Sequence, residues 1–486
     1  MDERTPLLER PTDLHSQVRN SKLYLAVMAA VLGNFVFGYS MVYPSAVLPQ
    51  LQKPDVDPRL RMNKSQTALF GSIFTLGAAA GGLGAMVLND LIGRKLSIMS
   101  SAVPSSVGFM LLVGATDLWM LHLGRFLTGI AGGITAASIP VYISEISHKK
   151  VRGTLGSCPQ ITAVLGALVL YALGLVLPWR WLALAGEVPV LLMVVLLMFM
   201  PSSPRRLLSL HKDQEAERAL CWLRGDRYDT NEELYSIKES ISTQTRVTLA
   251  QLLTPTFYRP ILISVGMRFL QQMTGITPIL VYLEPIFAQS QVSLEAKYDA
   301  VIVGVVRLFS VILAAFLMDK AGRKALLYTS SMLMFLASLT LTVTSHNPCP
   351  TNGTMPVDYH STLLTGMGAD QQTGSPIPII STVVFIFGYA MGWGPITWLL
   401  MSEVLPLAAR GVASGICVTV SWLTAFCLTQ AFTYVVSAYG LVVPYFAFTV
   451  VCVLCLLFNA VCIPETRGRT LEEIEDYFRR RSPSRP

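Results

Sequence analysis

The sequence "DLIGRK" from Asp90 to Lys95 and the sequence "DKAGRK" from Asp319 to Lys324 are two copies of one charged turn. Each copy lies between two long apolar stretches. A turn built on Gly and Arg lets two helices reverse direction tightly, and its cations favour the lipid–water interface. Two such turns, far apart in one chain, predict that one bundle of helices occurs twice.

A second pair of motifs follows in the same order. "SEISHKKVRG" places Glu145 seven residues before Arg152. "SEVLPLAARG" places Glu403 seven residues before Arg410. Both motifs run from the end of an apolar stretch into the next loop. We therefore expect two pseudo-symmetric halves, with a ligand site where the halves meet.

The composition requires a membrane protein. The chain has 486 residues, of which 52% are hydrophobic and 14% are charged, and its mean hydropathy is +0.52. Lipid offers the backbone no hydrogen-bond partners, so long unalternated apolar runs must span as helices. We expect an all-α protein of twelve transmembrane helices at about 22–42, 67–88, 97–116, 119–143, 157–177, 181–200, 260–282, 298–318, 325–344, 377–400, 411–435 and 441–463.

Lysine and arginine indicate the orientation. If both ends are cytosolic, the opposite loops contain only Lys53, Arg59, Arg61, Lys64, Arg180 and Lys297. The positive-inside rule therefore predicts cytosolic N- and C-termini. The net charge of +7 then faces the cytosol and the anionic lipid of the bilayer, and we expect no nucleic-acid partner.

Five segments follow from this topology. They are a cytosolic N-terminal tail (1–21), a six-helix bundle (22–200), a cytosolic linker with short amphipathic helices (201–259), a second six-helix bundle (260–463) and a cytosolic C-terminal tail (464–486). Because the tail at 1–21 is polar and the first apolar run has spanning length, we expect no cleaved signal peptide.

Several classes of chemistry are not indicated. Glycines spaced by four, Gly77 with Gly81 and Gly129 with Gly133, predict close helix packing. Neither glycine run is followed by the Lys-Ser/Thr of a phosphate loop, so nucleotide binding is not expected. The six histidines show no metal-ligand spacing, and no catalytic constellation is evident. We expect no metal, no cofactor and no enzymatic activity.

Charged residues at the cytosolic helix ends have two interpretations. They either anchor the topology or form ion pairs that close the cytosolic side when the outer side is open, and break as the halves rock. The candidate gating residues are Asp90, Arg94, Glu145 and Arg152 in the first half, and Asp319, Arg323, Glu403, Arg410 and Glu465 in the second.

Polar side chains near the membrane centre are the candidate substrate site. Gln271 and Gln272 are adjacent in the seventh expected helix, where carboxamides are costly unless they face a wet cavity or a partner helix. Carboxamides both donate and accept, which suits a ligand covered in hydroxyls, and Gln160 offers the same group from the first half. Trp398 and Trp422 could stack on sugar rings, although either one alone could be an interfacial anchor.

One arginine, Arg307 in "VGVVRLFSVIL", stands near the middle of the eighth expected helix. Such a charge costs at least about 2.5 to 3.5 kcal/mol on insertion scales and should face a cavity or a partner. It is either held by helix-end carbonyls and a carboxylate, or it donates hydrogen bonds to the substrate. Together with Arg268, it makes the second half of the cavity positive.

Several motifs together resemble the sugar porter branch of the major facilitator superfamily, and within it the third class of facilitative glucose transporters. They are "FGY" at Phe37 to Tyr39, the paired D-x-x-G-R-K turns, "GRFLTGIAGG", "VRGTLGSCPQ", "QQMTGI", "GPITW" and "PETRGR". The likeness runs from about Lys22 to Arg469. It implies the major facilitator fold and facilitative uniport of hexoses such as glucose or fructose by alternating access.

The resemblance also implies site residues. It places the family's hydroxyl-binding residues on Gln160, Gln271 and Gln272, with Trp398 and Trp422 lining the cavity. The chain departs from the family pattern with Thr277 and Arg307 in place of asparagines, Ala390 in place of a glutamate, "RFL" at 268–270 in place of Gln-Leu-Ser, and "PSSPRRL" at 201–207 in place of "PESPRWL". These departures leave the substrate open among hexoses, polyols and anionic sugars.

The mode of transport depends on one position in the first helix. Ser40 stands where proton-coupled relatives of the family have an aspartate, which favours a uniporter. A proton-coupled sugar or polyol symporter and a non-transporting sugar sensor are the alternatives.

Two short motifs indicate sorting and modification. In "ERTPLL", Glu3 stands four residues before Leu7 and Leu8, the acidic dileucine pattern that clathrin adaptor complexes bind. Because the third class is known for internal retention, we expect endosomes or lysosomes, with cycling to the plasma membrane. Asn352 begins "NGT" in the long outer loop and is the expected glycan site.

Overall fold

The computed structural model describes residues 20–54, 56–148, 151–225, 230–242, 254–289, 296–346, 376–405, 410–466 and 478. The sorting residues Glu3, Leu7 and Leu8 and the expected glycan site at Asn352 lie outside these residues. The side chains of Asp319 and Arg410 are also outside the described part.

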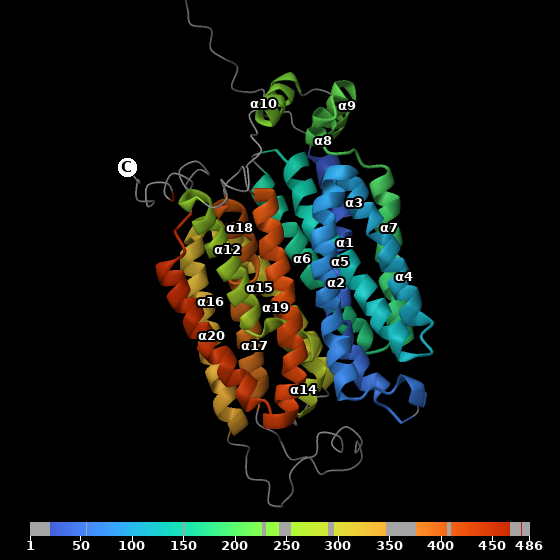
Figure 1. Ribbon diagram of the computed structural model, residues 1–486, viewed down its shortest axis with the longest axis vertical. Coiled ribbons are helices and arrows are strands. Elements are labelled where there is room, and N and C mark those ends of the chain that lie inside the picture. Colours follow the sequence, from blue (N-terminus) through green and yellow to red (C-terminus); the bar gives the residue numbers. More distant parts are fainter. Residues whose placement is uncertain are drawn as a thin grey trace, which may run out of the picture.

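Two helical bundles stand side by side (Figure 1). The first contains α1 (Ser21–Leu51), α2 (Lys64–Leu91), α3 (Arg94–Ser100), α4 (Ala102–Val113), α5 (Leu118–Ile146), α6 (Arg152–Gly174) and α7 (Trp179–Met198), with a short 3-10 turn at Pro58–Leu60. The second contains α12 (Pro255–Met273), α13 (Ile276–Val281), α14 (Leu283–Gln289), α15 (Ala296–Ala321), α16 (Arg323–His346), α17 (Ile377–Met391), α18 (Pro395–Val404), α19 (Arg410–Tyr439) and α20 (Val442–Val461). The halves meet chiefly where α2 packs along α19 and α6 packs along α15.

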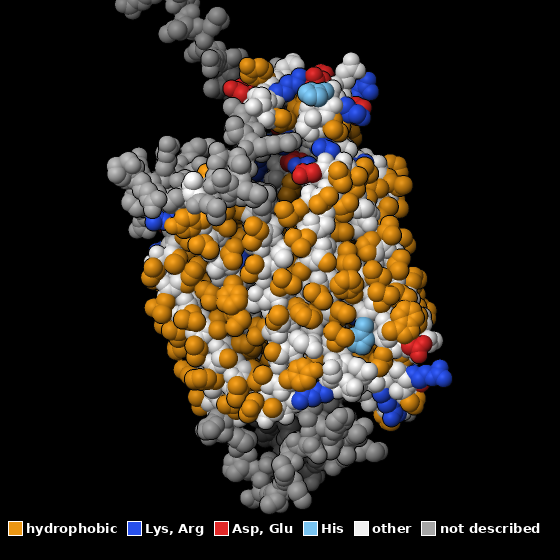
Figure 2. Space-filling view, viewed as in Figure 1, with side chains coloured by type: hydrophobic (Ala, Val, Ile, Leu, Met, Phe, Trp, Pro, Cys, Tyr) orange, Lys and Arg blue, Asp and Glu red, His pale blue; other side chains and the backbone are white. Residues whose placement is uncertain are grey.

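The surface agrees with a membrane location. Hydrophobic side chains cover the face of both bundles, and charged side chains gather at the two ends (Figure 2). In the described residues, 11 helices are long and apolar enough to cross a membrane. Of the twelve expected segments, the one at 260–282 is not among these 11.

The segment at 260–282 is interrupted at Gly275, between α12 and α13. Its φ of +85° is in the left-handed region, and a Cβ there would meet the ring of Phe448 at 2.2 Å. The expectation of one continuous helix over 260–282 is therefore wrong. The tenth segment is also broken, where α17 ends at Met391 and α18 begins at Pro395, and Gly392 and Gly394 lie at this break.

Glycines bring α2 and α5 close together. A Cβ on Gly81 would lie 2.1 Å from the carbonyl oxygen of Ile130, and one on Gly133 would lie 2.2 Å from that of Ala78. Only hydrogen fits in such spaces, so the two backbones touch, as the small-residue spacing predicted.

Three short cytosolic helices, α8 (Pro204–Ser209), α9 (Asp213–Arg224) and α10 (Asn231–Ser242), cap the first half (Figure 1). The guanidinium of Arg224 donates two hydrogen bonds to the carboxylate of Glu233, at 3.1 and 2.6 Å, and one of 2.8 Å to the carbonyl oxygen of Ile146 at the end of α5. The ammonium of Lys22 in α1 lies 5.6 Å from the centre of the Trp222 ring. These contacts attach the cytosolic helices to the first bundle.

Candidate functional site

The two halves are joined by hydrogen bonds toward the outer ends of their helices. Within the described ranges, these bonds run from Ser72 Oγ to Gln430 Oε1 (2.7 Å), from Tyr171 Oη to the carbonyl of Leu280 (3.1 Å), from Tyr282 Oη to the carbonyls of Thr67 and Ala68 (3.5 Å each), and from the Glu284 amide to Ser45 Oγ (3.1 Å). The outer side is therefore closed.

Gln271, in the last turn of α12, is 1% exposed and fully engaged. Its amide nitrogen donates to the hydroxyl of Tyr389 at 3.0 Å and to the carbonyl oxygen of Trp393 at 2.7 Å, while its oxygen accepts a hydrogen bond from Arg268. The bond to Trp393 gives a partner to a backbone carbonyl at the break between α17 and α18. Gln271 thus connects the seventh segment to the interrupted tenth segment.

Gln272 faces a different helix. Its amide nitrogen donates to Ser421 Oγ in α19 at 3.1 Å, and its oxygen accepts from Thr277 Oγ1 at 2.7 Å. Because Thr277 follows the break at Gly275, this pair ties α13 back to the end of α12. The two adjacent glutamines are therefore both bonded to protein partners of the second half.

The two candidate tryptophans have different surroundings. The guanidinium carbon of Arg268 lies 3.9 Å from the centre of the Trp398 ring, so a cation covers that face of the indole. Trp422 is 4% exposed. Its ring packs edge-on against the ring of Phe37 of the first half, with the two ring centres 5.4 Å apart. Its indole N–H is buried without an acceptor. Trp422 thus has a free hydrogen-bond donor where the halves meet, whereas Trp398 does not offer its covered face for stacking.

Gln160 and Arg307 lie on opposite sides of the same interface. One helical turn away from Gln160 and Arg307, the halves pack together through an apolar cluster of Val164 in α6, Val311 in α15 and Ala390 in α17. Gln160 is partly exposed, and no hydrogen bond from the described part of the chain reaches its carboxamide. It remains a candidate ligand for a hydroxyl.

The sequence reasoning did not single out Arg125, although it lies in an apolar run as Arg307 does. Arg125 in α5 is 1% exposed and donates a hydrogen bond to the backbone carbonyl of Ser40. Its guanidinium carbon lies 4.9 Å from the centre of the Phe74 ring and 5.7 Å from that of Phe70. In the described part of the chain no carboxylate pairs with it. An isolated arginine in an apolar run was the available signal.

One carboxyl group lies near the outer end of the site. Glu284 in α14 is 8% exposed, and its backbone amide donates to Ser45 of α1. Lys297 lies near enough to interact with this carboxyl group electrostatically. The pair of Glu284 and Lys297 belongs to the closed outer side.

The charged turn of the first half is held by Glu145. The Arg94 Nε atom lies 3.0 Å from the Glu145 carboxylate, which also accepts a hydrogen bond of 2.5 Å from Ser203 Oγ. The ammonium of Lys95 donates to the carbonyl of Met200 at 2.7 Å, near the end of α7. The turn therefore joins α3 to the ends of α5 and α7.

The second half repeats this arrangement. The guanidinium of Arg323 lies 3.3 Å from the Glu403 carboxylate, which accepts a hydrogen bond of 2.6 Å from Thr466 Oγ1. The carboxylate of Glu465 also accepts the backbone amides of Arg323 and Lys324, at 3.2 and 3.1 Å, at the start of α16. Glu465 thus stabilises a helix N-terminus directly.

Each ion pair lies within its own half, and neither joins the first half to the second. Arg152 donates to the carbonyl of Ser147 at 3.3 Å, and Asp90 is exposed. The structure brings Arg94 to Glu145 and Arg323 to Glu403, whereas the partners of Asp319 and Arg410 lie outside the described residues. Since the outer side is closed, the proposed role of these residues in closing the cytosolic side stays a prediction.

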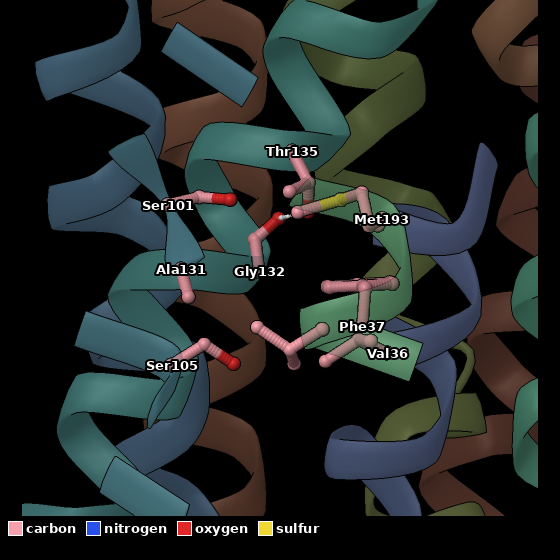
Figure 3. A pocket seen from close by; sticks show the side chains of 10 residues that line it. Val36, Phe37, Ser101, Ser105, Ala131, Gly132, Thr135 and Met193 are labelled. Atoms are coloured by element: carbon pink, nitrogen blue, oxygen red, sulfur yellow. Dashed lines mark hydrogen bonds between the residues drawn. The ribbon is translucent and has the colours of Figure 1, made fainter. Parts of the chain in front are cut away.

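A small hollow lies inside the first half, between α1, α4, α5 and α7 (Figure 3). Ser101, Ser105, Thr135 and Met193 line it, and the hydroxyl of Ser105 is buried without a partner. The volume open to the centre of a water molecule is ≈ 10 Å³, so the hollow can hold about one water. It is too small for a sugar.

Comparison with known proteins agrees with this geometry. The family model described as "Sugar (and other) transporter" matches residues 25–478. The human protein "Solute carrier family 2, facilitated glucose transporter member 6" is 57% identical over 468 residues, covering 95% of this chain and 92% of its own. The cattle (Bos taurus) facilitated glucose transporter member 8 is 39% identical over 485 residues, covering 98% of each chain.

A solved structure shows the same fold. A proton:xylose symporter of the major facilitator superfamily, bound to 6-bromo-6-deoxy-D-glucose, superposes with a TM-score of 0.77 at 25% identity, covering 95% of this chain and 100% of that chain. The two-half all-helical fold expected from the repeated turns is therefore confirmed.

The repeat generates a prediction at Ser202. Ser203 and Thr466 play equivalent parts, so Ser202 stands where the second half has Glu465, and α3 begins without a side-chain cap. Ser202→Glu should place a carboxylate at the start of α3 and stabilise the first half by about 0.3 to 1 kcal/mol. Thermal unfolding of the purified protein at low salt should show a higher midpoint.

The matched control is Ser202→Gln, which has nearly the same shape and no charge. Its midpoint should stay near that of the unchanged protein, and high salt should reduce the difference between the two variants. Equal midpoints for the Glu and Gln variants at low salt would show that the halves are not equivalent at this position.

Proposed function

Because this chain belongs to the sugar (and other) transporter family, we propose that it is a facilitative uniporter that carries hexose sugars such as glucose or fructose by alternating access. Among the described residues, the observation that carries the proposal is the unpartnered indole N–H of Trp422 where the halves meet, with Gln160 free of hydrogen bonds in the first half and Gln271 and Gln272 bonded in the second. Free donors and acceptors beside an aromatic edge suit a ligand with many hydroxyls and an apolar ring face.

The rocking motion has a structural basis in the same geometry. Each Arg–Glu pair fastens the helices of one half, and the hydrogen bonds between halves all lie on the outer side in the described ranges. Breaking those few bonds would open the outer side without disturbing either bundle. Two rigid halves that turn about a central sugar site make an alternating-access carrier.

Uniport is supported by the surroundings of Arg125. A proton-coupled carrier needs a titratable group that changes its charge during the cycle. Arg125 instead donates to the backbone carbonyl of Ser40 and stands among aromatic rings, with no acidic partner in the part of the chain that the structure describes. The substrate's own gradient would then be the driving force.

Sorting belongs to the proposal as well. The acidic dileucine of Glu3, Leu7 and Leu8 would bind clathrin adaptor complexes and hold the carrier on endosomes or lysosomes, with cycling to the plasma membrane. Asn352 would carry a glycan on the lumenal or extracellular side. Both suggestions rest on sequence motifs alone.

The transport mode can be tested in proteoliposomes. Uptake of glucose or fructose by the purified protein should be saturable and should not change when a proton gradient is imposed. Ser40→Asp should give Arg125 an acidic partner and make uptake depend on external pH, whereas the uncharged control Ser40→Asn should not. Stimulation of the unchanged protein by a proton gradient would favour the symporter, and binding without uptake would favour the sensor.

The sugar contact can be tested at Trp422. Trp422→Phe keeps an aromatic ring against Phe37 but removes the free indole N–H. Loss of one neutral hydrogen bond to the sugar, about 0.5 to 1.5 kcal/mol, should raise KM by about two- to twelvefold with little change in thermal stability. An unchanged KM in a folded Trp422→Phe protein would remove this residue from the site.

A further inference from the structure

Arg307 has no partner in the part of the chain that the structure describes. It lies in the middle of α15 (Ala296–Ala321), and its Nε atom is buried without an acceptor. No ion pair, hydrogen bond or ring contact holds its guanidinium, which is partly exposed between the halves. In the described residues, neither helix-end carbonyls nor a carboxylate therefore binds the Arg307 guanidinium.

A second cation lies nearby. Arg268 is 1% exposed, stacks on Trp398 and donates to Gln271, but its Nε atom is also buried without an acceptor. Gln271 accepts a hydrogen bond from Arg268 and donates one of 3.0 Å to the hydroxyl of Tyr389. Val311, one helical turn after Arg307, packs with Ala390, the residue after Tyr389, and both guanidinium groups interact with the phenol electrostatically. Two guanidinium groups thus approach one tyrosine from α12 and α15.

The acidic groups around this pair do not neutralise it. Arg307 also interacts electrostatically with Tyr171 of the first half, and so does the carboxyl group of Glu284. Glu284 forms no ion pair with Arg307, and Lys297 lies beside it instead. Among the described residues, the two arginines therefore form a positive site with no protein counterion.

Buried cations without counterions are strongly unfavourable in a membrane unless they have a function. A guanidinium presents a planar fork of N–H donors that matches a carboxylate or a phosphate. We propose that this site takes a hexose derivative with an anionic group, a carboxylate or a phosphate, in preference to a neutral hexose. This proposal rests on the proposed function and specifies its substrate class.

The proposal has an electrical consequence. A uniporter that carries a monovalent sugar acid moves one negative charge per cycle, whereas uniport of glucose moves none. A membrane potential should therefore drive the anion and leave glucose unaffected. At 100 mV, positive inside, the inside-to-outside ratio of a monovalent anion should approach about fifty at equilibrium.

The experiment uses the full-length protein in liposomes with a potassium diffusion potential. Uptake of labelled glucuronate, glucose 6-phosphate and glucose is measured with and without the potential. We expect at least one of the two anions to be taken up, to depend on the potential and to compete with glucose. Uptake of only one of them would identify carboxylate or phosphate as the preferred group.

Three results would overturn the proposal. If glucose is taken up while neither anion enters or competes, the inference fails and the proposed function stands. If uptake of the anions does not respond to the potential, the anion is not carried alone and the inference also fails. If none of the three compounds is taken up or changes the thermal stability of the protein, the proposed function fails with it.

Variants locate the effect. Arg307→Gln should lower the ratio of glucuronate to glucose affinity by about tenfold or more, the loss of one charge-assisted hydrogen bond. Arg307→Lys keeps the charge and should retain most of the preference. Arg218→Gln removes one cation from the exposed face of α9 and should leave the ratio unchanged. An equal ratio in Arg307→Gln and the unchanged protein would contradict the assignment.

Discussion

The Arg–Glu ion pair at the cytosolic end of each half is the interaction on which the rest of this structure depends. In both halves an arginine that follows the Gly turn reaches a glutamate at the end of a spanning helix, and a hydroxyl from the segment after the last helix joins them. One carboxylate thus fastens three segments that are distant in the sequence. Each half can then move as a unit, and the residues between the halves can serve a ligand.

The middle of the interface follows a different constraint. Inside a bilayer each polar group needs a partner in the protein, and most have one, as Gln271 does at the break between α17 and α18. Among the described residues, the exceptions at the interface between the halves include the Trp422 N–H and the Nε atom of Arg307, and no hydrogen bond reaches the carboxamide of Gln160. Unsatisfied groups at the interface of two halves offer hydrogen bonds that a polar ligand can complete.

Much of the fold could be predicted from the sequence because apolar length and a repeated turn are local signals. The Arg94–Glu145 and Arg323–Glu403 ion pairs each join the two motifs that the sequence repeats, the charged turn and the glutamate at a helix end, although the sequence did not say which residues would pair. The break at Gly275 was not predicted, because it depends on the ring of Phe448 from another helix. The covering of Trp398 by Arg268 and the isolation of Arg125 among aromatic rings also arise from packing between helices, which no local pattern records.

The central claim is that two rigid halves turn about a ligand held between them, and distances between nitroxide labels test it most directly. One pair of labels at Arg59 and Tyr439 spans the halves on the outer side, and a second pair at Leu91 and Leu210 lies within the first half; all four positions are exposed. A transported sugar should shift the distance distribution of the first pair and leave that of the second unchanged. A shift within the first half, or none between the halves, would contradict the account.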